Sequence, residues 1–292
     1  MSALRIWWLA ARPRTLPTGI APVLVGTALA QDDFHLLRFL AALVGAVFIQ
    51  VGANLSNDYS DARRGADTED RLGPVRVTAG GLVPPRQVLV ATYVAFAVAV
   101  LAGSYLIAVA GFEILLVGVL SILAGVLYTG GPRPYGYEGL GEIFVFLFFG
   151  VAAVAGSYFA QVEEWSAVAF ALSVPVGLLA SALLVVNNVR DMETDRRAGK
   201  RTLAVRLGRD RTRDLYQFML TLAYAFVAVP VIAGDLDPWA LLCWLTAPLA
   251  LRLVQTVRTH ADGPTLNRAL AQTAMTQLLF CVLLSAGILI GG

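Results

Sequence analysis

Long apolar runs dominate this chain and restrict the folds open to it. Only 14% of its 292 residues are charged, against roughly 25% in a typical soluble domain. In lipid every backbone polar group must be paired within the protein, so long apolar runs predict helices. Nine runs are long enough, or nearly so, to cross a hydrocarbon core of about 30 Å: Leu16–Ala30, Phe39–Gly52, Val88–Ala110, Ile114–Gly131, Ile143–Gln161, Val168–Val186, Leu215–Ala233, Trp239–Leu251 and Ala269–Ile290. The sequence therefore predicts an all-α, polytopic membrane protein, with nine transmembrane helices and a single domain over residues 1–292.

Basic residues gather in alternate connections between these runs. If the amino terminus lies inside and there are nine crossings, every Lys and Arg except Arg38 falls in an inside segment. The outside connections instead carry acidic residues, namely Asp32, Asp33, Glu113, Glu163, Glu164, Asp235 and Asp237. This asymmetry follows the positive-inside rule. It predicts a multi-pass protein of the cell's inner (cytoplasmic) membrane, surrounded by membrane lipid and with no nucleic-acid partner.

Two short polar stretches interrupt the apolar sequence, and both are predicted to face the cytoplasm. One runs from Asn57 through Asp61 to Asp67, and the other from Asn187 and Asn188 through Asp191 to Asp195. Each contains Asn-x-x-x-Asp just past an apolar run and is followed by basic residues. Carboxylate and amide oxygens are the ligands that a hard divalent cation prefers.

The spacing within each stretch refines this interpretation. Asp191 and Asp195 are four apart, so on a helix they share a face and repel unless a cation lies between them. Asp61 and Asp67 are six apart with Gly65 between them, so we expect the helix to open near Gly65. A single loop aspartate is usually just solvated. Two matching clusters on one predicted side favour a shared Mg²⁺ site.

Carboxylates beside basic loops suit a diphosphate, because Mg²⁺ bridges carboxylate and phosphate oxygens while Arg and Lys neutralise the rest. Nine apolar helices around a cavity that opens to the cytoplasmic side suit a long lipid tail. Together they indicate a polyprenyl diphosphate, whose C1–O bond ionises once the leaving group is stabilised. A third polar segment, from Tyr128 to Glu142, is predicted on the same side; it either lines an acceptor pocket or forms an interfacial turn.

These motifs resemble the two aspartate-rich signatures of the UbiA superfamily of intramembrane aromatic prenyltransferases, over nearly the whole chain. Three further segments resemble its menaquinone branch: Ala11-Arg12-Pro13-Arg14-Thr15-Leu16-Pro17, the run from Gly65 to Arg76, and Gly139-Leu140-Gly141-Glu142. The resemblance implies transfer of a polyprenyl group to 1,4-dihydroxy-2-naphthoate, at the carbon bearing the carboxylate, with loss of CO₂ and diphosphate to give demethylmenaquinone. Many relatives space the first motif as Asp-x-x-x-Asp, whereas five residues separate Asp61 from Asp67 here, which leaves the role of Asp58 open.

The resemblance also implies roles for individual residues. Catalytic and metal-binding roles fall to Asp61, Asp67, Asp191 and Asp195, with Asn57 as a further metal ligand. Diphosphate contacts fall to Asn57, Asn188, Arg190 and Lys200, and Asn187 could exchange roles with Asn188. Arg12 is the candidate for the acceptor carboxylate, and Tyr128 and Glu142 are candidates for the wall of the acceptor pocket.

Other functions remain open from the sequence. Another member of the superfamily would use a different aromatic acceptor, 4-hydroxybenzoate or homogentisate. A secondary transporter also has polar breaks in its helices, but its sites usually lie near the bilayer midplane, where these runs are almost free of charge. The CDP-alcohol phosphatidyltransferases need a glycine after Asp-x-x-Asp, whereas Ala62 follows Asp61.

Overall fold

The computed structural model describes residues 2–67 and 72–292, and every regular element among them is helical. Thr68, Asp70 and Arg71, which belong to one of the menaquinone-branch segments, lie outside the described residues. The elements are α1 (Ala3–Ala11), α2 (Pro17–Ala28), η1 (Gln31–Asp33), α3 (Leu36–Arg63), α4 (Pro85–Ala110), α5 (Glu113–Leu127), η2 (Tyr135–Glu138), α6 (Gly141–Val145), η3 (Phe146–Ala152), α7 (Ala153–Val162), α8 (Ala167–Arg197), α9 (Leu203–Leu207), α10 (Arg209–Ala233), η4 (Pro238–Thr246), α11 (Ala247–Thr259) and α12 (Gly263–Gly291).

Among the described residues, seven helical segments are long and apolar enough to cross a membrane. Five of them are single helices, namely α3, α4, α8, α10 and α12. The other two are composite, since α6, η3 and α7 run together as Gly141–Val162, and η4 with α11 as Pro238–Thr259. The helices α2 and α5 are apolar but shorter. Each of the nine predicted runs thus falls on an apolar helical segment, and seven of these reach the length of a span.

The structure extends several predicted helices. The second predicted run, Phe39–Gly52, is the middle of the 28-residue helix α3, and the sixth, Val168–Val186, is the first part of the 31-residue helix α8. Both Asn-x-x-x-Asp motifs therefore lie within the last turns of long helices. The expected break near Gly65 is confirmed, because α3 ends at Arg63 and Gly65 has a φ of 65°. A short helix before the first apolar run, α1, was not predicted.

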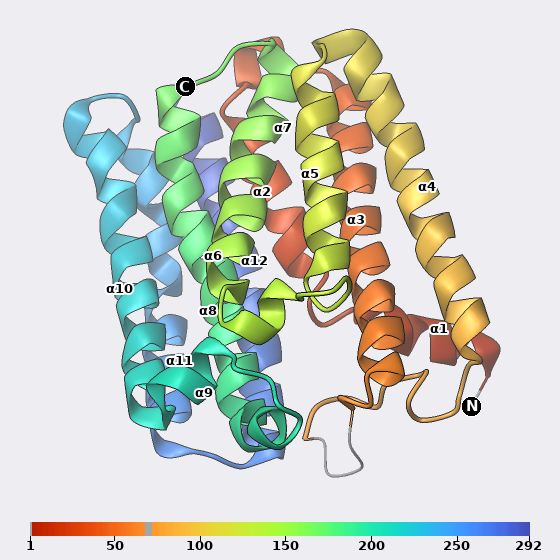
Figure 1. Ribbon diagram of the computed structural model, residues 1–292. Helices are drawn as coiled ribbons and strands as arrows, with labels where there is room; N and C mark the ends of the chain where they lie inside the picture. Colours follow the sequence, from red (N-terminus) through yellow and green to blue (C-terminus); the bar gives the residue numbers. More distant parts are fainter. Residues whose placement is uncertain (1, 68–71) are drawn as a thin grey trace.

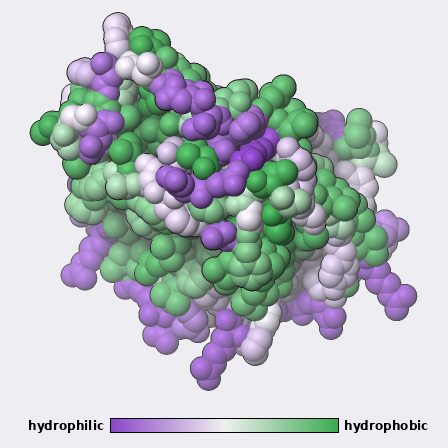
Figure 2. Space-filling view, turned by 90° about the horizontal axis from the view of Figure 1, so that it is seen from above, coloured by the Kyte–Doolittle hydropathy of each residue, from purple (hydrophilic) through white to green (hydrophobic). Residues whose placement is uncertain are grey.

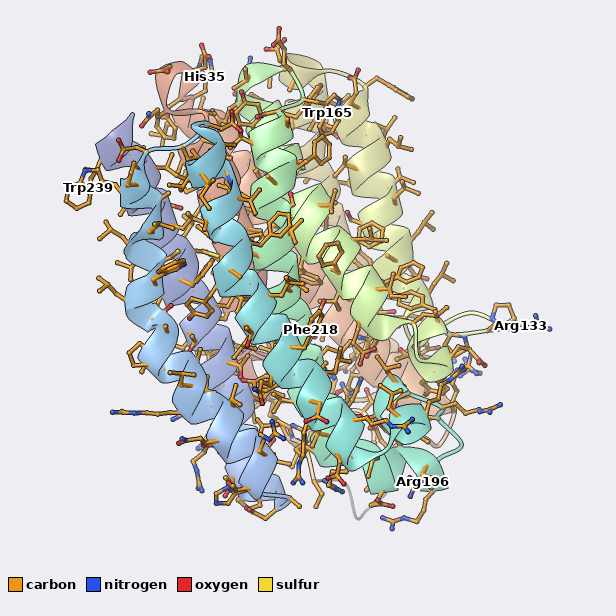
Figure 3. All side chains as sticks on the ribbon, turned by 90° about the vertical axis from the view of Figure 1, so that its left-hand side faces the viewer. His35, Arg133, Trp165, Arg196, Phe218 and Trp239 are labelled. Atoms are coloured by element: carbon orange, nitrogen blue, oxygen red, sulfur yellow. The ribbon has the colours of Figure 1, made fainter. Side chains whose placement is uncertain are left out.

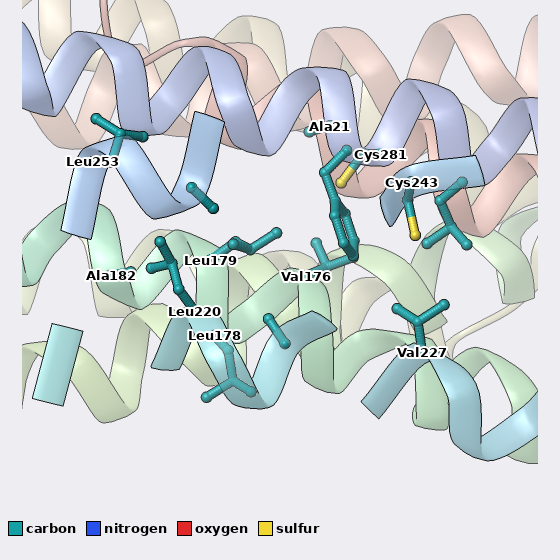
Figure 4. Packing of buried hydrophobic residues seen from close by; sticks show 14 of the residues in the cluster. Ala21, Val176, Leu178, Leu179, Ala182, Leu220, Val227, Cys243, Leu253 and Cys281 are labelled. Carbon is teal, nitrogen blue, oxygen red and sulfur yellow. The ribbon is translucent and has the colours of Figure 1, made fainter. Parts of the chain in front are cut away.

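The largest apolar core packs α8 against α10 and α12, with α2 and η4 at its edge. Figure 4 shows Leu179 of α8, Leu220 of α10 and Cys281 of α12 in the space between these helices. Glycine permits a close approach between η3 and α8, where a Cβ added to Gly150 would lie 2.7 Å from the Cα of Gly177. This rigid half of the molecule holds the second aspartate motif in place.

The two ends of the molecule differ in character. The amino terminus, α9 and the carboxyl ends of α3 and α8 lie at one end, and the carboxyl terminus lies at the other (Figure 1). Arg133 and Arg196 lie at the first end, whereas His35, Trp165 and Trp239 lie at the opposite end (Figure 3). Figure 2, which looks onto the opposite end, shows hydrophobic residues over much of this face, with a group of hydrophilic residues among them and further hydrophilic residues around the rim. We call the end with α9 the motif end.

Candidate active site

A cavity of about 440 Å³ lies within the bundle and extends to the motif end. Its walls are largely apolar and come from α3, α4, α5, α7 and α8, while polar side chains collect where α3 and α8 end. Eight of the predicted site residues line it: Arg12, Asn57, Asp61, Tyr128, Asn188, Asp191, Asp195 and Lys200. The two motifs, 130 residues apart in sequence when counted from Asp61 to Asp191, thus face one chamber.

Asp61 lies at the centre of a hydrogen-bonded cluster and is only 1% exposed. Its Oδ1 accepts a 2.7 Å hydrogen bond from the Tyr137 hydroxyl. Its Oδ2 is 3.2 Å from Nη2 of Arg76 and 3.4 Å from Nζ of Lys200. Since a buried carboxylate needs counter-charge and donors, these groups fix the orientation of Asp61 and supply the opposite charge.

Arg76 also connects the first motif to its outlying member. Its Nε lies 3.5 Å from Oδ1 of Asp67, whose side chain is almost fully buried. Asp67 does not line the cavity itself. The long spacing within this motif therefore brings a second carboxylate back to the same arginine that meets Asp61.

The second motif is organised differently. Arg190 forms a two-pronged ion pair with the adjacent Asp191, with 2.8 Å between Nε and Oδ1 and a second contact from Nη2 to Oδ2. The same guanidinium donates to Oδ1 of Asn187 at 2.8 Å and to Oδ1 of Asn267 on α12 at 2.7 Å. Arg190 lies behind the cavity wall rather than on it. Its geometry orients Asp191, and the predicted contact of Arg190 with diphosphate stays a prediction.

Of the three residues predicted to bind the acceptor, two line the cavity and one does not. Arg12 and Tyr128 line the cavity, whereas Glu142 lies behind it. One carboxylate oxygen of Glu142 accepts a 2.8 Å hydrogen bond from Nδ2 of Asn188. Glu142 therefore fixes the amide orientation of Asn188, which does face the cavity. Arg12 has a φ of 56°, a left-handed conformation that is costly for a residue other than glycine and that clusters at ligand-binding positions.

Tyr137 and Lys200 close the motif end of the cavity together. Nζ of Lys200 lies 4.7 Å from the centroid of the Tyr137 ring, within the range of a cation–π contact. Burial, followed by the negative charge of Asp61 and their hydrogen bond, raises the pKa of Tyr137 above its ordinary value. The phenol stays protonated at neutral pH and acts as a donor.

Asp58 has a structural role, which settles the question that the sequence left open. Its two carboxylate oxygens accept hydrogen bonds from the backbone N–H groups of Val77 at 3.0 Å and Thr78 at 2.9 Å. These bonds draw the segment after α3 back against the helix. Arg76, next in the chain to Val77, is thereby carried to Asp61.

Sequence reasoning missed several residues of the site. Arg76 and Tyr137 contact Asp61, and the Thr129 hydroxyl donates to Oδ1 of Asn57 at 2.9 Å. All three belong to polar segments between apolar runs, and this position is the only signal that marks them. Asn187, predicted as an alternate for Asn188, lines the cavity and also accepts a hydrogen bond from Arg190.

The oxygen donors suit a hard cation bound together with a substrate. Asn57, Asp61, Asp191 and Asp195 supply carboxylate and amide oxygens to one cavity. In the described part of the chain, no three His, Cys, Asp or Glu side chains converge tightly enough to hold a metal by themselves. Carboxylate and amide oxygens are ligands that Mg²⁺ accepts, with waters and substrate phosphates completing its coordination.

Comparison with known proteins decides the family. The profile of the UbiA prenyltransferase family matches residues 19–289. The chain belongs to the UbiA prenyltransferase family. This confirms the resemblance noted in its motifs. It is 41% identical to the 1,4-dihydroxy-2-naphthoate octaprenyltransferase of Mycobacterium tuberculosis, over 100% of this chain and 99% of the relative. It is 38% identical to the enzyme of that name from Escherichia coli, over 96% of this chain and 95% of the relative.

Solved structures of the family share the fold. A UbiA homologue from Aeropyrum pernix superposes with a TM-score of 0.71 at 16% identity, covering 94% of this chain and 97% of that one. A UbiA homologue from Archaeoglobus fulgidus, solved with DMAPP and Mg²⁺, superposes with a TM-score of 0.66 at 14% identity, covering 96% and 99%. At such low identity these likenesses establish the fold alone.

The role of Asp58 can be tested separately from catalysis. In Asp58→Ala, two buried N–H groups lose a charged acceptor, at a cost of about 1.5–3 kcal/mol for each bond. We expect the segment around Val77 to become sensitive to limited proteolysis of the purified protein, with cleavage sites mapped by mass spectrometry. Asp235→Ala, at the exposed opposite end, is the matched control, and an unchanged cleavage pattern in Asp58→Ala would contradict the assignment.

Proposed function

We propose that this chain, acting as a single domain, transfers a polyprenyl group from polyprenyl diphosphate to 1,4-dihydroxy-2-naphthoate. CO₂ and diphosphate are released and demethylmenaquinol, the quinol form of demethylmenaquinone, is formed, a step of menaquinone biosynthesis. The observation that carries this proposal is the convergence of both aspartate motifs on one cavity whose remaining walls are apolar. Full-length relatives at 38–41% identity bear the name of this naphthoate activity.

The polar end of the cavity is suited to receive the diphosphate. Asp61, Asp191 and Asp195, with Asn57, would hold Mg²⁺, and Asp67 supports Asp61 through Arg76. When bound, the metal supplies positive charge that stabilises the leaving diphosphate. Lys200 and Arg76 add fixed positive charge beside Asp61, and the Tyr137 hydroxyl fixes that carboxylate. These groups favour departure of diphosphate with the electron pair of the C1–O bond.

The apolar walls serve the other half of the reaction. The allylic chain lies among apolar side chains that exclude water, which would otherwise capture the cation. The ring of Tyr128, on the cavity wall, presents a π face to positive charge. The acceptor's ring carbon forms the new C–C bond to C1. Loss of CO₂ then returns its bonding pair to the ring and restores aromaticity without a proton transfer.

We place the motif end at the cytoplasmic face of the inner membrane. Two apolar segments precede the first motif and six precede the second, so if each segment crosses the membrane, both motifs lie on the same side as the amino terminus. The basic residues of this end satisfy the positive-inside rule. The shorter helices α2 and α5 then cross with support from their neighbours, which cover Pro22 inside α2.

The carboxylates are tested by substitution. Asp61→Ala and Asp191→Ala should each lower transfer by at least about hundredfold, the scale for losing one electrostatic contributor to a transition state. The measurement is turnover of purified enzyme with labelled farnesyl diphosphate, with and without EDTA, followed by addition of Mg²⁺. Asp235→Ala should behave as wild type. Retained turnover in either variant while the protein elutes as a folded species, or EDTA-insensitive turnover of wild type, would refute this assignment.

The identity of the acceptor is tested by offering three phenols to the enzyme separately. We expect a labelled lipid product from purified enzyme and farnesyl diphosphate with 1,4-dihydroxy-2-naphthoate, and none with 4-hydroxybenzoate or homogentisate. Thin-layer chromatography of the organic extract measures this directly. A product with 4-hydroxybenzoate alone would move the chain to another branch of the family.

The orientation is tested by single-cysteine labelling. Arg133→Cys at the motif end and Trp165→Cys at the other end are both exposed sites, and both native cysteines are buried. A membrane-impermeant maleimide should label Arg133→Cys only in inverted vesicles and Trp165→Cys only in intact spheroplasts. The reverse pattern would place the motif end outside.

A further inference from the structure

A polar strip on α3 continues from the motif end deep into the apolar part of the cavity. It consists of Gln50, Asn54, Asn57 and Asp61, spaced by four, three and four residues, so that all lie on one face of the helix. All four line the cavity. At 1.5 Å per residue, Gln50 lies about 16 Å along the helix from Asp61. The strip thus connects the diphosphate end of the cavity with its apolar part.

The amide of Gln50 is held in one orientation. Its Nε2 donates a 2.6 Å hydrogen bond to the carbonyl oxygen of Thr15. Its Oε1 packs against bare backbone, because a Cβ added to Gly19 would lie 2.3 Å from it. The residue is 6% exposed, and Oε1 has no hydrogen-bond partner among the described residues. The Gln50 side chain thus lines the cavity, and its amide oxygen is buried there without a donor.

Thr18 of α2 also carries a buried polar atom that lacks a hydrogen-bond partner. It is 3% exposed and lines the cavity, and its hydroxyl oxygen has no partner in the described parts of the chain. A buried polar atom without a partner costs free energy. Two such atoms belong to side chains that line the same cavity, which points to a ligand that completes them.

The chemistry of Gln50 selects which ligand this is. An amide oxygen accepts hydrogen bonds and cannot donate them. A prenyl chain offers no donor, and an ionised diphosphate offers only acceptors, which an amide oxygen repels. The remaining substrate, a phenol, carries O–H groups that satisfy Oε1.

We propose that Gln50 and Thr18 form a hydroxyl pocket that binds the 4-hydroxyl group of the naphthoate acceptor. This inference rests on the proposed function. The 1-hydroxyl lies next to the carboxylate and donates to it within the molecule, so the 4-hydroxyl is the one available to the protein. Arg12, on the same wall six residues before Thr18, is in place for the carboxylate. The two residues then set acceptor specificity, because a site built around a substrate O–H discriminates against analogues that lack it.

The test compares two ligands and two substitutions. Affinity is measured by titration calorimetry on purified protein in nanodiscs under reducing conditions, for 1,4-dihydroxy-2-naphthoate and for 1-hydroxy-2-naphthoate, which lacks the 4-hydroxyl. Wild type should bind the dihydroxy compound at least about tenfold more tightly. In Gln50→Met and Thr18→Val this preference should shrink to within about twofold, while the KM for farnesyl diphosphate stays within about twofold.

The chain offers matched controls for both substitutions. Gln277 and Thr27 are also buried with unpartnered polar atoms, but neither lines the cavity. Gln277→Met and Thr27→Val should therefore keep the wild-type preference. The inference is overturned if wild type shows no preference, if Gln50→Met keeps it, or if the controls lose it equally. Intact discrimination in binding without any prenyl transfer to naphthoate would instead overturn the proposed function and leave the hydroxyl pocket standing.

Discussion

The buried Asp61 carboxylate is the interaction on which the rest of the site depends. Asp61 comes from α3, and its partners come from three other places: Arg76 from the segment after α3, Tyr137 from η2, and Lys200 from the turn after α8. Removing a carboxylate from water is costly unless donors and opposite charge surround it. Four separate parts of the chain must therefore meet at one point, and their meeting closes the motif end of the cavity.

In the second motif, the charge of the buried aspartate is neutralised by a residue next to it in the sequence. Asp191 is neutralised by Arg190, its neighbour in sequence, and Asn187 and Asn267 fix that arginine. The two halves of the site are thus built unequally despite their shared Asn-x-x-x-Asp pattern. The first aspartate depends on three loops or turns, whereas the second is fixed by α8 and α12 within the best-packed part of the bundle. The first half is the one that ligand binding can rearrange at least cost, since loops carry fewer packing contacts than a helical core.

What the sequence could predict follows from the range of each interaction. Apolar runs predict helices because lipid forces backbone pairing within each segment, and the break at Gly65 is a local backbone effect. The convergence of the motifs was predicted because both lie on one side of the membrane. The pairing of Arg76 with Asp61, and of Glu142 with Asn188, depends on how distant helices pack. Nothing local distinguishes Arg76 from the other arginines of the inner segments, and a lone Gln50 within an apolar run does not reveal the missing donor of its amide oxygen.

The cavity combines two demands that conflict in a membrane. The diphosphate end needs dense charge, and there two carboxylates, Asp61 and Asp67, are paired with two cations, Arg76 and Lys200, so that little net charge is buried. The deeper part must stay apolar for a prenyl chain, yet a phenolic acceptor must be oriented there. Neutral groups reconcile these demands, because an amide such as Gln50 orients a hydroxyl without the desolvation cost of a charge. The strip on α3 accordingly changes from carboxylate to amide as it enters the membrane, from Asp61 through Asn57 and Asn54 to Gln50. This gradient places ionising chemistry at the water-facing end and recognition of the acceptor within reach of it.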